Sequence, residues 1–475
     1  MRRGTGVLLA AVLLAACTGG QGPPPPGHRP SVSPSPVASG STSGGPHPAS
    51  CQAAPPYANP AQGRPRYTLG VRLDLARGHV IGKESVTFTP DLPTGRLVFR
   101  LWPNAPPQAA EGAHLAVGRV QSGDTPLASR LTDPTTLEVT PPAPLAGGQS
   151  ITVSMAFTLK LPGAVLDRLS HDGSTVLLGS FFPVLPWVDG QGWALDPPTT
   201  TLAEASTDPT ADFDVTIRLP KGLELPHGIE ILATGERDGP SHWTATAVRD
   251  FAIAVGSFKT ATNVLYAPDP ITVTVGIERT VAAPPPAQLL ERIDETLGSL
   301  ANHYGPYPWK SFSLVLVNVL ERSGIEYPNL VFEGARGIDR VTTHEMAHQW
   351  FYSLVGNDQA LDPWLDEALA TWAAAQIDGY LPFIQQQPIH GVAENHVGSP
   401  MAFWDHHSRA YELGVYFRGV QALASLGSPD LIDCALRTYV AQRAYQVAVP
   451  GDLLDALDAV IPDATAKLAS FGIHP

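Results

Sequence analysis

Residues 341–372 hold side chains at spacings that constrain the fold more than any other part of this chain. His344, Glu345 and His348 form an H-E-x-x-H motif, and Glu367 follows in the same stretch. Residues four apart on a helix share one face, so the two histidines can direct their imidazoles at one cation. Two imidazoles and a carboxylate favour Zn2+, which in catalytic sites takes three protein ligands and leaves a fourth position open. The motif therefore predicts a site for one zinc ion.

The stretch also predicts a pair of helices. The first carries the histidines and closes at Gly356 and Asn357, and the second begins near Pro363 and returns Glu367 to the histidine face. Glu345 then remains free as a general base toward a water activated by zinc, which predicts metal-assisted hydrolysis. The alternative is a pair of core histidines on an amphipathic helix.

The N-terminal segment is typical of an export signal followed by a lipid attachment site. Residues 1–16 carry two arginines and an apolar run too short to span a bilayer, which predicts a signal peptide. The ending L-A-A-C at 14–17 resembles a bacterial lipobox, so we expect cleavage before Cys17 and lipidation of Cys17. An ordinary signal peptide with a chance cysteine is the alternative. We therefore expect an extracytoplasmic protein, anchored by lipid to a bacterial cell membrane.

A tether is predicted after this attachment site. Residues 17–55 are dominated by Gly, Pro, Ser, Thr and Ala, and they bury too little apolar surface to offset the entropy of ordering. Cys51 and Cys434 can form a disulfide in an oxidising compartment, or they can both remain unpaired thiols. The net charge of -14, with no basic cluster, argues against a nucleic-acid partner.

The remaining residues are numerous enough for two domains, and the first of these, at 56–262, reads as β structure. Apolar residues alternate with others from Tyr67 to Leu75, as a half-buried strand requires, and similar runs occupy 151–159 and 213–219. Turns rich in Pro and Gly separate these runs. An antiparallel sheet or sandwich is expected, without a catalytic constellation.

The second domain, at 263–475, reads as α-rich. Residues 313–319 predict a strand, and 323–328 predict a turn or sheet edge just before the metal-binding helix. Helical patterns dominate from Leu413 to the end. A first helix is predicted by the spacing of Leu289, Leu290, Ile293, Leu297 and Leu300.

Several motifs together resemble the gluzincin aminopeptidases, the family that includes aminopeptidase N and leukotriene hydrolase. The resemblance implies an α+β multidomain fold. An N-terminal antiparallel β saddle or sandwich would be followed by a thermolysin-like, α-rich zinc catalytic domain. The matching segments, in the family's order, are R-D-F-A at 249–252, Y-G-P-Y-P at 304–308, G-I-E at 324–326, H-E-M-A-H-Q-W-F at 344–351 and W-L-D-E at 364–367.

The resemblance implies that Gly324 and Glu326 bind the substrate. Glu326 stands where the family has the glutamate of G-x-M-E-N, whose carboxylate binds a free α-amine. Such a carboxylate selects a cationic N-terminus and limits cleavage to the first peptide bond. Ser323, Ile325 and Tyr327 depart from the motif. The alternative for Glu326 is a strand-edge side chain that faces solvent.

The resemblance also implies a tyrosine that stabilises the oxyanion, from the family's Y-x-K-G segment. Tyr416 is followed by a basic residue at the third position, Arg418, and we predict that it has this role. Tyr411 matches the spacing but has Leu413 where the cation belongs, and it is the alternative. Either tyrosine could instead lie on a helix surface or in the core.

Two further positions complete the comparison with the family. Asp362 corresponds to a family aspartate, which implies a contact to a ligand histidine, and its place before Pro363 also suits a helix N-cap. The family's glutamine or glutamate anchor for the substrate amine has no counterpart in residues 174–183, S-T-V-L-L-G-S-F-F-P.

Together these features predict a zinc aminopeptidase that acts on peptides with a free N-terminus. In this hypothesis Glu345 is the general base, and one Zn2+ ion is the cofactor. A zinc metallopeptidase without strict N-terminal selection is one alternative. A catalytically silent, peptide-binding lipoprotein is the other.

Overall fold

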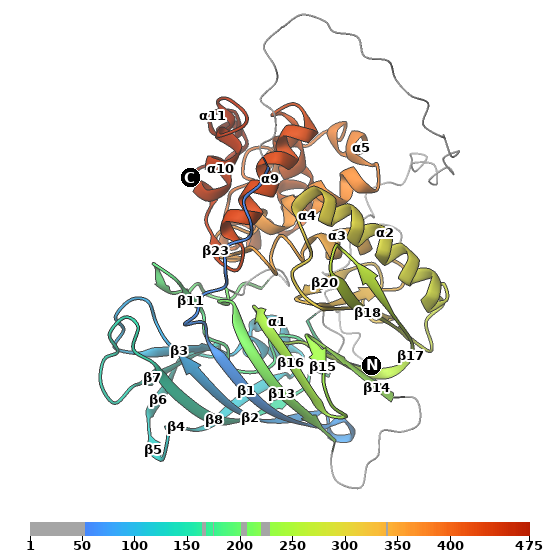
Figure 1. Ribbon diagram of the computed structural model, residues 1–475. Helices are drawn as coiled ribbons and strands as arrows, with labels where there is room; N and C mark the ends of the chain where they lie inside the picture. Colours follow the sequence, from blue (N-terminus) through green and yellow to red (C-terminus); the bar gives the residue numbers. More distant parts are fainter. Residues whose placement is uncertain (1–52, 164–167, 174, 201–206, 220–228, 339–340) are drawn as a thin grey trace, which may run out of the picture.

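The computed structural model describes residues 53–163, 168–173, 175–200, 207–219, 229–338 and 341–475. A β-rich part and a helical part lie one above the other, with a second sheet beside them (Figure 1). This arrangement confirms the predicted β-rich N-terminal part and the α-rich part that follows it. The predicted signal peptide, Cys17, Cys51 and most of the tether lie outside the described residues. Cys434, on helix α9, is disulfide-bonded.

The β-rich part is built on an eight-stranded sheet in the order β15-β16-β13-β1-β2-β8-β4-β5. Strand β1 alternates exposed and buried side chains, which confirms the predicted alternation from Tyr67. The pairing of β1 with β13 is parallel, whereas the other pairings are antiparallel. The strands are β1 (Arg66–Asp74), β2 (His79–Phe88), β4 (His114–Ser122), β5 (Thr125–Pro126), β8 (Ile151–Lys160), β13 (Ala211–Arg218), β15 (Glu236–Arg237) and β16 (His242–Val248).

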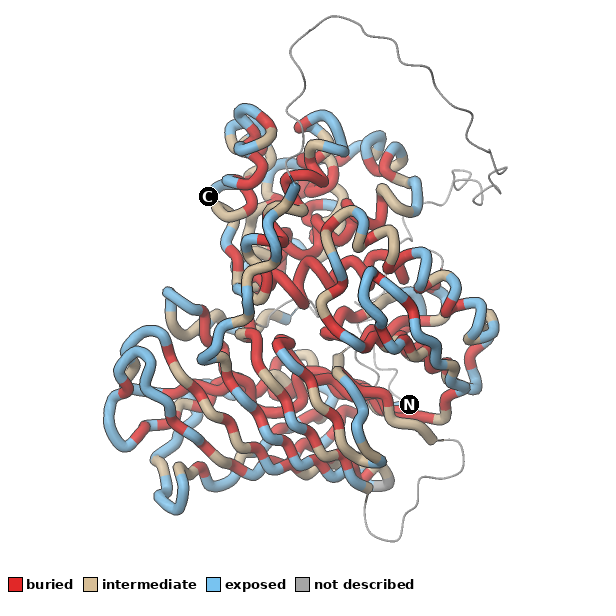
Figure 2. The backbone as a smooth tube through the Cα atoms, in the orientation of Figure 1, coloured by how far each residue is buried: buried red, intermediate tan, exposed pale blue. Residues whose placement is uncertain are grey.

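Smaller sheets complete this part of the molecule. In Figure 2, buried residues alternate with half-buried and exposed ones along the strands of the large sheet, because alternate side chains point into the core. The smaller strands are β3 (Leu97–Arg100), β6 (Ala128–Asp133) and β7 (Thr136–Thr140) in one sheet, and β11 (Trp187–Val188) and β12 (Gly192–Trp193) in another. A short helix, α1 (Pro106–Ala110), follows β3.

A second sheet joins the two predicted domains. Strand β17 (Ile253–Tyr266) runs across the predicted boundary at residue 262 and pairs with strands from both sides of it. Strand β20 (Gly324–Tyr327) lies at the end of this sheet, in agreement with the predicted sheet edge. The other strands are β9 (Leu169–Asp172), β10 (Thr175–Leu178), β14 (Ile229–Ala233), β18 (Pro270–Glu278), β19 (Ser311–Val317) and β21 (Leu330–Gly334).

The helical part begins with α2 (Pro286–Tyr304), which packs on β17 and β18 through the predicted apolar face. None of the helices among the described residues is long and apolar enough to cross a bilayer. The other helices are α3 (Thr342–Ala347), α4 (Trp364–Ile377), α5 (Leu381–Gln385), α6 (Met401–Asp405), α7 (Ser408–Glu412), α8 (Arg418–Ala424), α9 (Pro429–Arg443), α10 (Pro450–Asp458) and α11 (Ala464–Leu468).

The R-D-F-A segment fastens the β-rich part to the helical part. Arg249 is buried, and its guanidinium donates to the carbonyl of Tyr352 at 2.8 Å, to that of Asp208 at 2.9 Å and to that of Gln446. A Cβ on Gly356 would lie 2.2 Å from the guanidinium carbon, so only glycine fits there. Arg249 thus supports the turn that follows the metal-binding helix.

Glu84, on β2, gives the protein a predicted pH-dependent stability. Its side chain is 2% exposed, and neither carboxylate oxygen has a hydrogen-bond partner among the described residues. Burial raises the pKa of Glu84 well above its ordinary value, so the folded protein keeps the proton that the unfolded chain releases above about pH 4.5. The free energy of unfolding should therefore fall as the pH rises from about 4.5 toward the raised pKa of Glu84 in the folded protein.

We expect Glu84→Leu to raise the free energy of unfolding by about 1–3 kcal/mol at pH 7, because it removes an unpartnered polar group. The gain should be smaller at pH 4, where the unfolded carboxyl is also protonated. Glu84→Gln is the matched control, since it removes only the ionisation. Denaturant unfolding at both pH values measures the effect. A gain for Glu84→Gln that is the same at pH 4 and pH 7 would contradict the assignment.

Candidate metal centre and substrate site

The first metal-binding helix ends earlier than predicted. Helix α3 stops at Ala347, and the chain continues through wider turns, in which the amide of Ser353 donates to the carbonyl of His348 at 2.9 Å. Gly356 and Asn357 do not close the helix. They form strand β22 (Gly356–Asn357), which pairs with β23 (Val447–Ala448). This pairing with a distant part of the chain holds the two residues in extended backbone, so they do not act as a helix cap. Helix α4 begins after Pro363, as predicted.

Three ligand atoms meet at the junction of α3 and α4. His344 Nε2 lies 3.1 Å from Glu367 Oε2 and 3.0 Å from His348 Nε2, and the third side, from His348 Nε2 to Glu367 Oε2, measures 3.5 Å. Ligands at about 2.0–2.1 Å from a tetrahedral zinc ion lie roughly 3.3 Å from one another. The triangle therefore fits the predicted zinc ligands, and all three residues are buried.

Both histidines are held with Nε2 turned toward this triangle. The Nδ1–H of His348 donates to the carbonyl of Phe351 at 2.9 Å. On the other ring, Nδ1 of His344 lies 3.4 Å from the hydroxyl of Thr371, which itself donates to the carbonyl of Glu367 at 2.7 Å. These partners leave each Nε2 with the lone pair that a metal requires. Phe351 and Thr371 were not identified from the sequence, although Thr371 lies one helical turn after Glu367.

The two predicted roles of Asp362 are both wrong. Its side chain contacts neither histidine within the described part of the chain, and no side chain caps the N-terminus of α4. Burial, together with the charge of Asp358, raises the pKa of Asp362 to about 7. The tertiary structure gives the orienting role to Phe351 and Thr371 instead.

Glu345 faces the same buried space as the ligands. Its Oε2 is buried and has no hydrogen-bond partner among the described residues, and burial raises the pKa of Glu345 well above its ordinary value. Gly324 lies directly against it, since a Cβ at that position would come within 2.4 Å of the carboxylate carbon of Glu345. Oxygen atoms of Glu326 and Glu345 and a ring nitrogen of His348 all lie within 4.8 Å of one another. The edge strand therefore brings Gly324 and Glu326 to the metal site.

Glu326 does not face solvent. Its carboxylate is buried, and Oε1 accepts a hydrogen bond of 2.9 Å from Nη2 of Arg168. Burial alone would raise the pKa of Glu326, but the positive charge of Arg168 holds it below its ordinary value. No sequence pattern identified Arg168.

Tyr327 fills the space beside Gly179, in the segment 174–183 that has no anchor residue. A Cβ built on Gly179 would lie 1.7 Å from the Tyr327 hydroxyl.

The two candidate tyrosines lie at different distances from the metal ligands. Tyr416 is part of a π-helical turn, Leu413–Phe417, and its ring lies 5.8 Å from that of His344 with the planes 19° apart. Tyr411 lies behind it, 5.6 Å from the ring of Tyr416 and 5.9 Å from that of Trp404. The geometry favours Tyr416 as the tyrosine that can reach a group at the metal centre.

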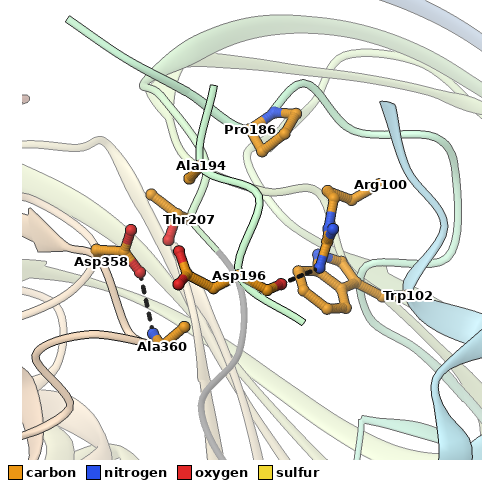
Figure 3. Close-up of a pocket in the computed structure, with 8 residues that line it drawn as sticks. All are labelled: Arg100, Trp102, Pro186, Ala194, Asp196, Thr207, Asp358 and Ala360. Atoms are coloured by element: carbon orange, nitrogen blue, oxygen red, sulfur yellow. Dashed lines mark hydrogen bonds between the residues drawn. The ribbon is translucent and has the colours of Figure 1, made fainter. Parts of the chain in front are cut away.

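A small cavity elsewhere in the structure plays no part in this site (Figure 3). Its volume of about 10 Å³ holds no more than one water, and none of the residues that line it belongs to the metal triangle. Arg100 Nη2 closes one side by donating to the carbonyl of Asp196 at 2.5 Å. The lining residues are Arg100, Trp102, Pro186, Ala194, Asp196, Thr207, Asp358 and Ala360.

Comparison with known proteins gives a family for the helical part. Residues 290–471 match the Peptidase family M1 domain. The chain is 26% identical over 215 residues to aminopeptidase RNPEPL1 of Mus musculus, and the aligned region covers 37% of this chain and 28% of that protein. It is 30% identical over 158 residues to the membrane alanyl aminopeptidase of Manduca sexta, covering 29% of this chain and 16% of that protein. The chain thus matches less than a third of the length of either relative.

Solved structures share the two-part fold over most of this chain. An M1 zinc metallopeptidase from Deinococcus radiodurans superimposes with a TM-score of 0.63 at 18% identity, covering 87% of this chain and 95% of that one. A mutant of an M1 zinc metallopeptidase from the same organism, bound to a Tyr-Ser-Ala substrate, gives a TM-score of 0.60 at 19% identity, covering 86% and 94%. At this identity the likeness establishes the fold.

Proposed function

We propose that this chain, whose residues 290–471 match the Peptidase family M1 domain, is a zinc-dependent aminopeptidase that removes N-terminal residues from peptides. The observation that carries the proposal is the meeting of two groups in one buried space. His344, His348 and Glu367 form the metal triangle, and the carboxylates of Glu345 and Glu326 lie beside it. The aminopeptidases among the relatives and the peptide-bound structure support a peptide as the substrate.

The residues divide the chemistry among them. A zinc ion bound at the triangle would polarise the scissile carbonyl and lower the pKa of the attacking water. Glu345 accepts the proton of that water and delivers it to the leaving amine, as its carboxylate allows, because the buried Oε2 has no hydrogen-bond partner among the described residues. Tyr416 donates a hydrogen bond to the developing oxyanion. Glu326 holds the α-amine and so sets the distance from the N-terminus to the cleaved bond.

A metallopeptidase without strict N-terminal selection is the second candidate. The observation in its favour is the Arg168–Glu326 ion pair, which already gives Glu326 a cationic partner. Both candidates share the metal centre and the general base. They differ only in what the substrate must present to Glu326.

Metal analysis and a substrate panel test the proposal. We expect one zinc per chain, loss of hydrolysis with a chelator and recovery on adding zinc. Unblocked aminoacyl substrates should be cleaved much faster than their N-acetyl forms. Equal cleavage of both would favour the second candidate. Zinc binding without hydrolysis of any substrate would overturn both and leave the peptide-binding lipoprotein.

We also propose that the protein is tethered by lipid outside the cytoplasmic membrane. The support is the L-A-A-C ending of the apolar N-terminal run and the Pro- and Gly-rich segment after it. In a bacterial host, the mature protein should begin at a lipid-modified Cys17 by mass spectrometry and partition into detergent. Cys17→Ser should abolish both properties. A mature wild-type N-terminus at another residue would contradict the anchor.

A further inference from the structure

We propose that Arg168 is a specificity-determining residue of this site, whose guanidinium competes with the substrate's α-ammonium group for the carboxylate of Glu326. The inference rests on the proposed function, because it assigns Glu326 to the N-terminus of a peptide. It adds a residue of the β-rich part to the substrate site. It also predicts that the preference for a free N-terminus is weaker than Glu326 alone would give.

The contact that carries the inference is a buried ion pair. Arg168 Nη2 lies 2.9 Å from Glu326 Oε1, and the two side chains are 19% and 5% exposed. In the described part of the chain, no other side chain or amide donates to the Glu326 carboxylate. At this depth solvent and salt screen the interaction little, so the positive charge of Arg168 acts on any ligand bound to Glu326.

Arg168 is held in this position at the end of the β9–β10 hairpin, in the second sheet. Its carbonyl accepts the amide of Gly179 at 2.8 Å, where the hairpin of β9 and β10 ends. Its guanidinium carbon lies 5.8 Å from the centre of the Tyr327 ring, within cation–π range, and Tyr327 itself fills the space beside Gly179. Arg168 therefore lies beside residues 174–183, the segment that has no glutamine or glutamate anchor for the substrate amine.

A substrate amine can bind Glu326 in two ways, and Arg168 opposes both. An ammonium group that takes the place of the guanidinium must first break the ion pair. An ammonium group on the second carboxylate oxygen lies close to the guanidinium and is repelled by its like charge. A neutral, acylated N-terminus meets neither penalty. Arg168 thus reduces the difference in affinity between the two kinds of peptide.

Binding measurements in the zinc-loaded Glu345→Gln background test this without turnover. The ligands are the tripeptide Leu-Ala-Ala and its N-acetyl form, with dissociation constants from calorimetry. Adding Arg168→Gln removes the charge but keeps a hydrogen-bond donor, and we expect the free peptide to bind about tenfold more tightly, while the N-acetyl form changes less than about twofold. Arg168→Lys is the matched control, which keeps the charge and should leave both constants within about twofold.

Other outcomes overturn the inference. Equal changes for both peptides would mean that Arg168 has only a structural role, and weaker binding of the free peptide by Arg168→Gln would mean that Arg168 assists the amine. Zinc content and circular dichroism confirm that each variant is folded. Turnover by the wild-type protein separates failure of the Arg168 role from failure of the proposed function, because a wild type that hydrolyses no peptide would contradict the proposed function itself. If the wild type is active and zinc-dependent but Arg168→Gln leaves the ratio of the two dissociation constants unchanged, the role of Arg168 is wrong and the proposed function stands.

Discussion

Replacing Glu345 by glutamine is expected to lower kcat about 10³-fold while the protein still binds one zinc ion. The amide has the shape of the carboxylate and fits against Gly324, so the site should stay folded. It cannot accept the proton of the attacking water. Because KM reflects contacts that the amide keeps, most of the loss should appear in kcat.

Steady-state kinetics with metal analysis of the same samples measure this effect. Glu295→Gln is the matched control, since Glu295 is an exposed carboxylate on α2 and its loss should leave kcat unchanged. A Glu345→Gln protein that binds zinc and keeps the wild-type rate would refute the assignment of the general base. A protein that has lost both zinc and activity would show instead that Glu345 supports the metal site.

Replacing Tyr416 by phenylalanine is expected to lower kcat about 10²–10³-fold with little change in KM. The hydroxyl would stabilise charge that develops only during the reaction, so its removal should not weaken binding of the ground state. The ring, which stacks on His344 at 5.8 Å, remains in place in the variant. Zinc affinity should therefore be unchanged.

Tyr411→Phe provides the internal control for this prediction. Tyr411 packs behind Tyr416 against Trp404, so its variant should keep kcat within about threefold of the wild type. The reverse result, a large loss for Tyr411→Phe and a small one for Tyr416→Phe, would transfer the oxyanion role to Tyr411. Small losses in both variants would show that neither hydroxyl takes part.

Local patterns in the sequence predicted much of the fold. The alternation from Tyr67 became β1, the leucine spacing after three prolines became α2, and the break at Pro363 became the start of α4. These features depend on residues a few positions apart, whose side chains select one face of a strand or helix. The metal ligands could be predicted from the motif around His344 for the same reason, since His344 and His348 lie one helical turn apart.

Predictions that depended on more distant contacts were less successful. The end of α3 was misplaced because Gly356 pairs with Val447, on a strand far along the chain. The family resemblance implied one role for Asp362 and its place before Pro363 suggested another, and tertiary packing gives it neither. Strand β17 spans residue 262, the predicted domain boundary, and pairs with strands from both sides of it, a connection that no local pattern indicates.

The sequence by itself therefore determined the candidate metal-binding residues, the proposed general base and the class of fold, because each is encoded in short spacings. Only the tertiary structure decided what surrounds them. Arg168 and Glu326 are 158 residues apart, and no periodicity links them. They meet because β9, β10 and β20 belong to one sheet, which brings a cation of the β-rich part to the carboxylate predicted to hold the substrate. Pairing between strands distant in the chain sets such contacts, so the selectivity of this site could be inferred only from the folded protein.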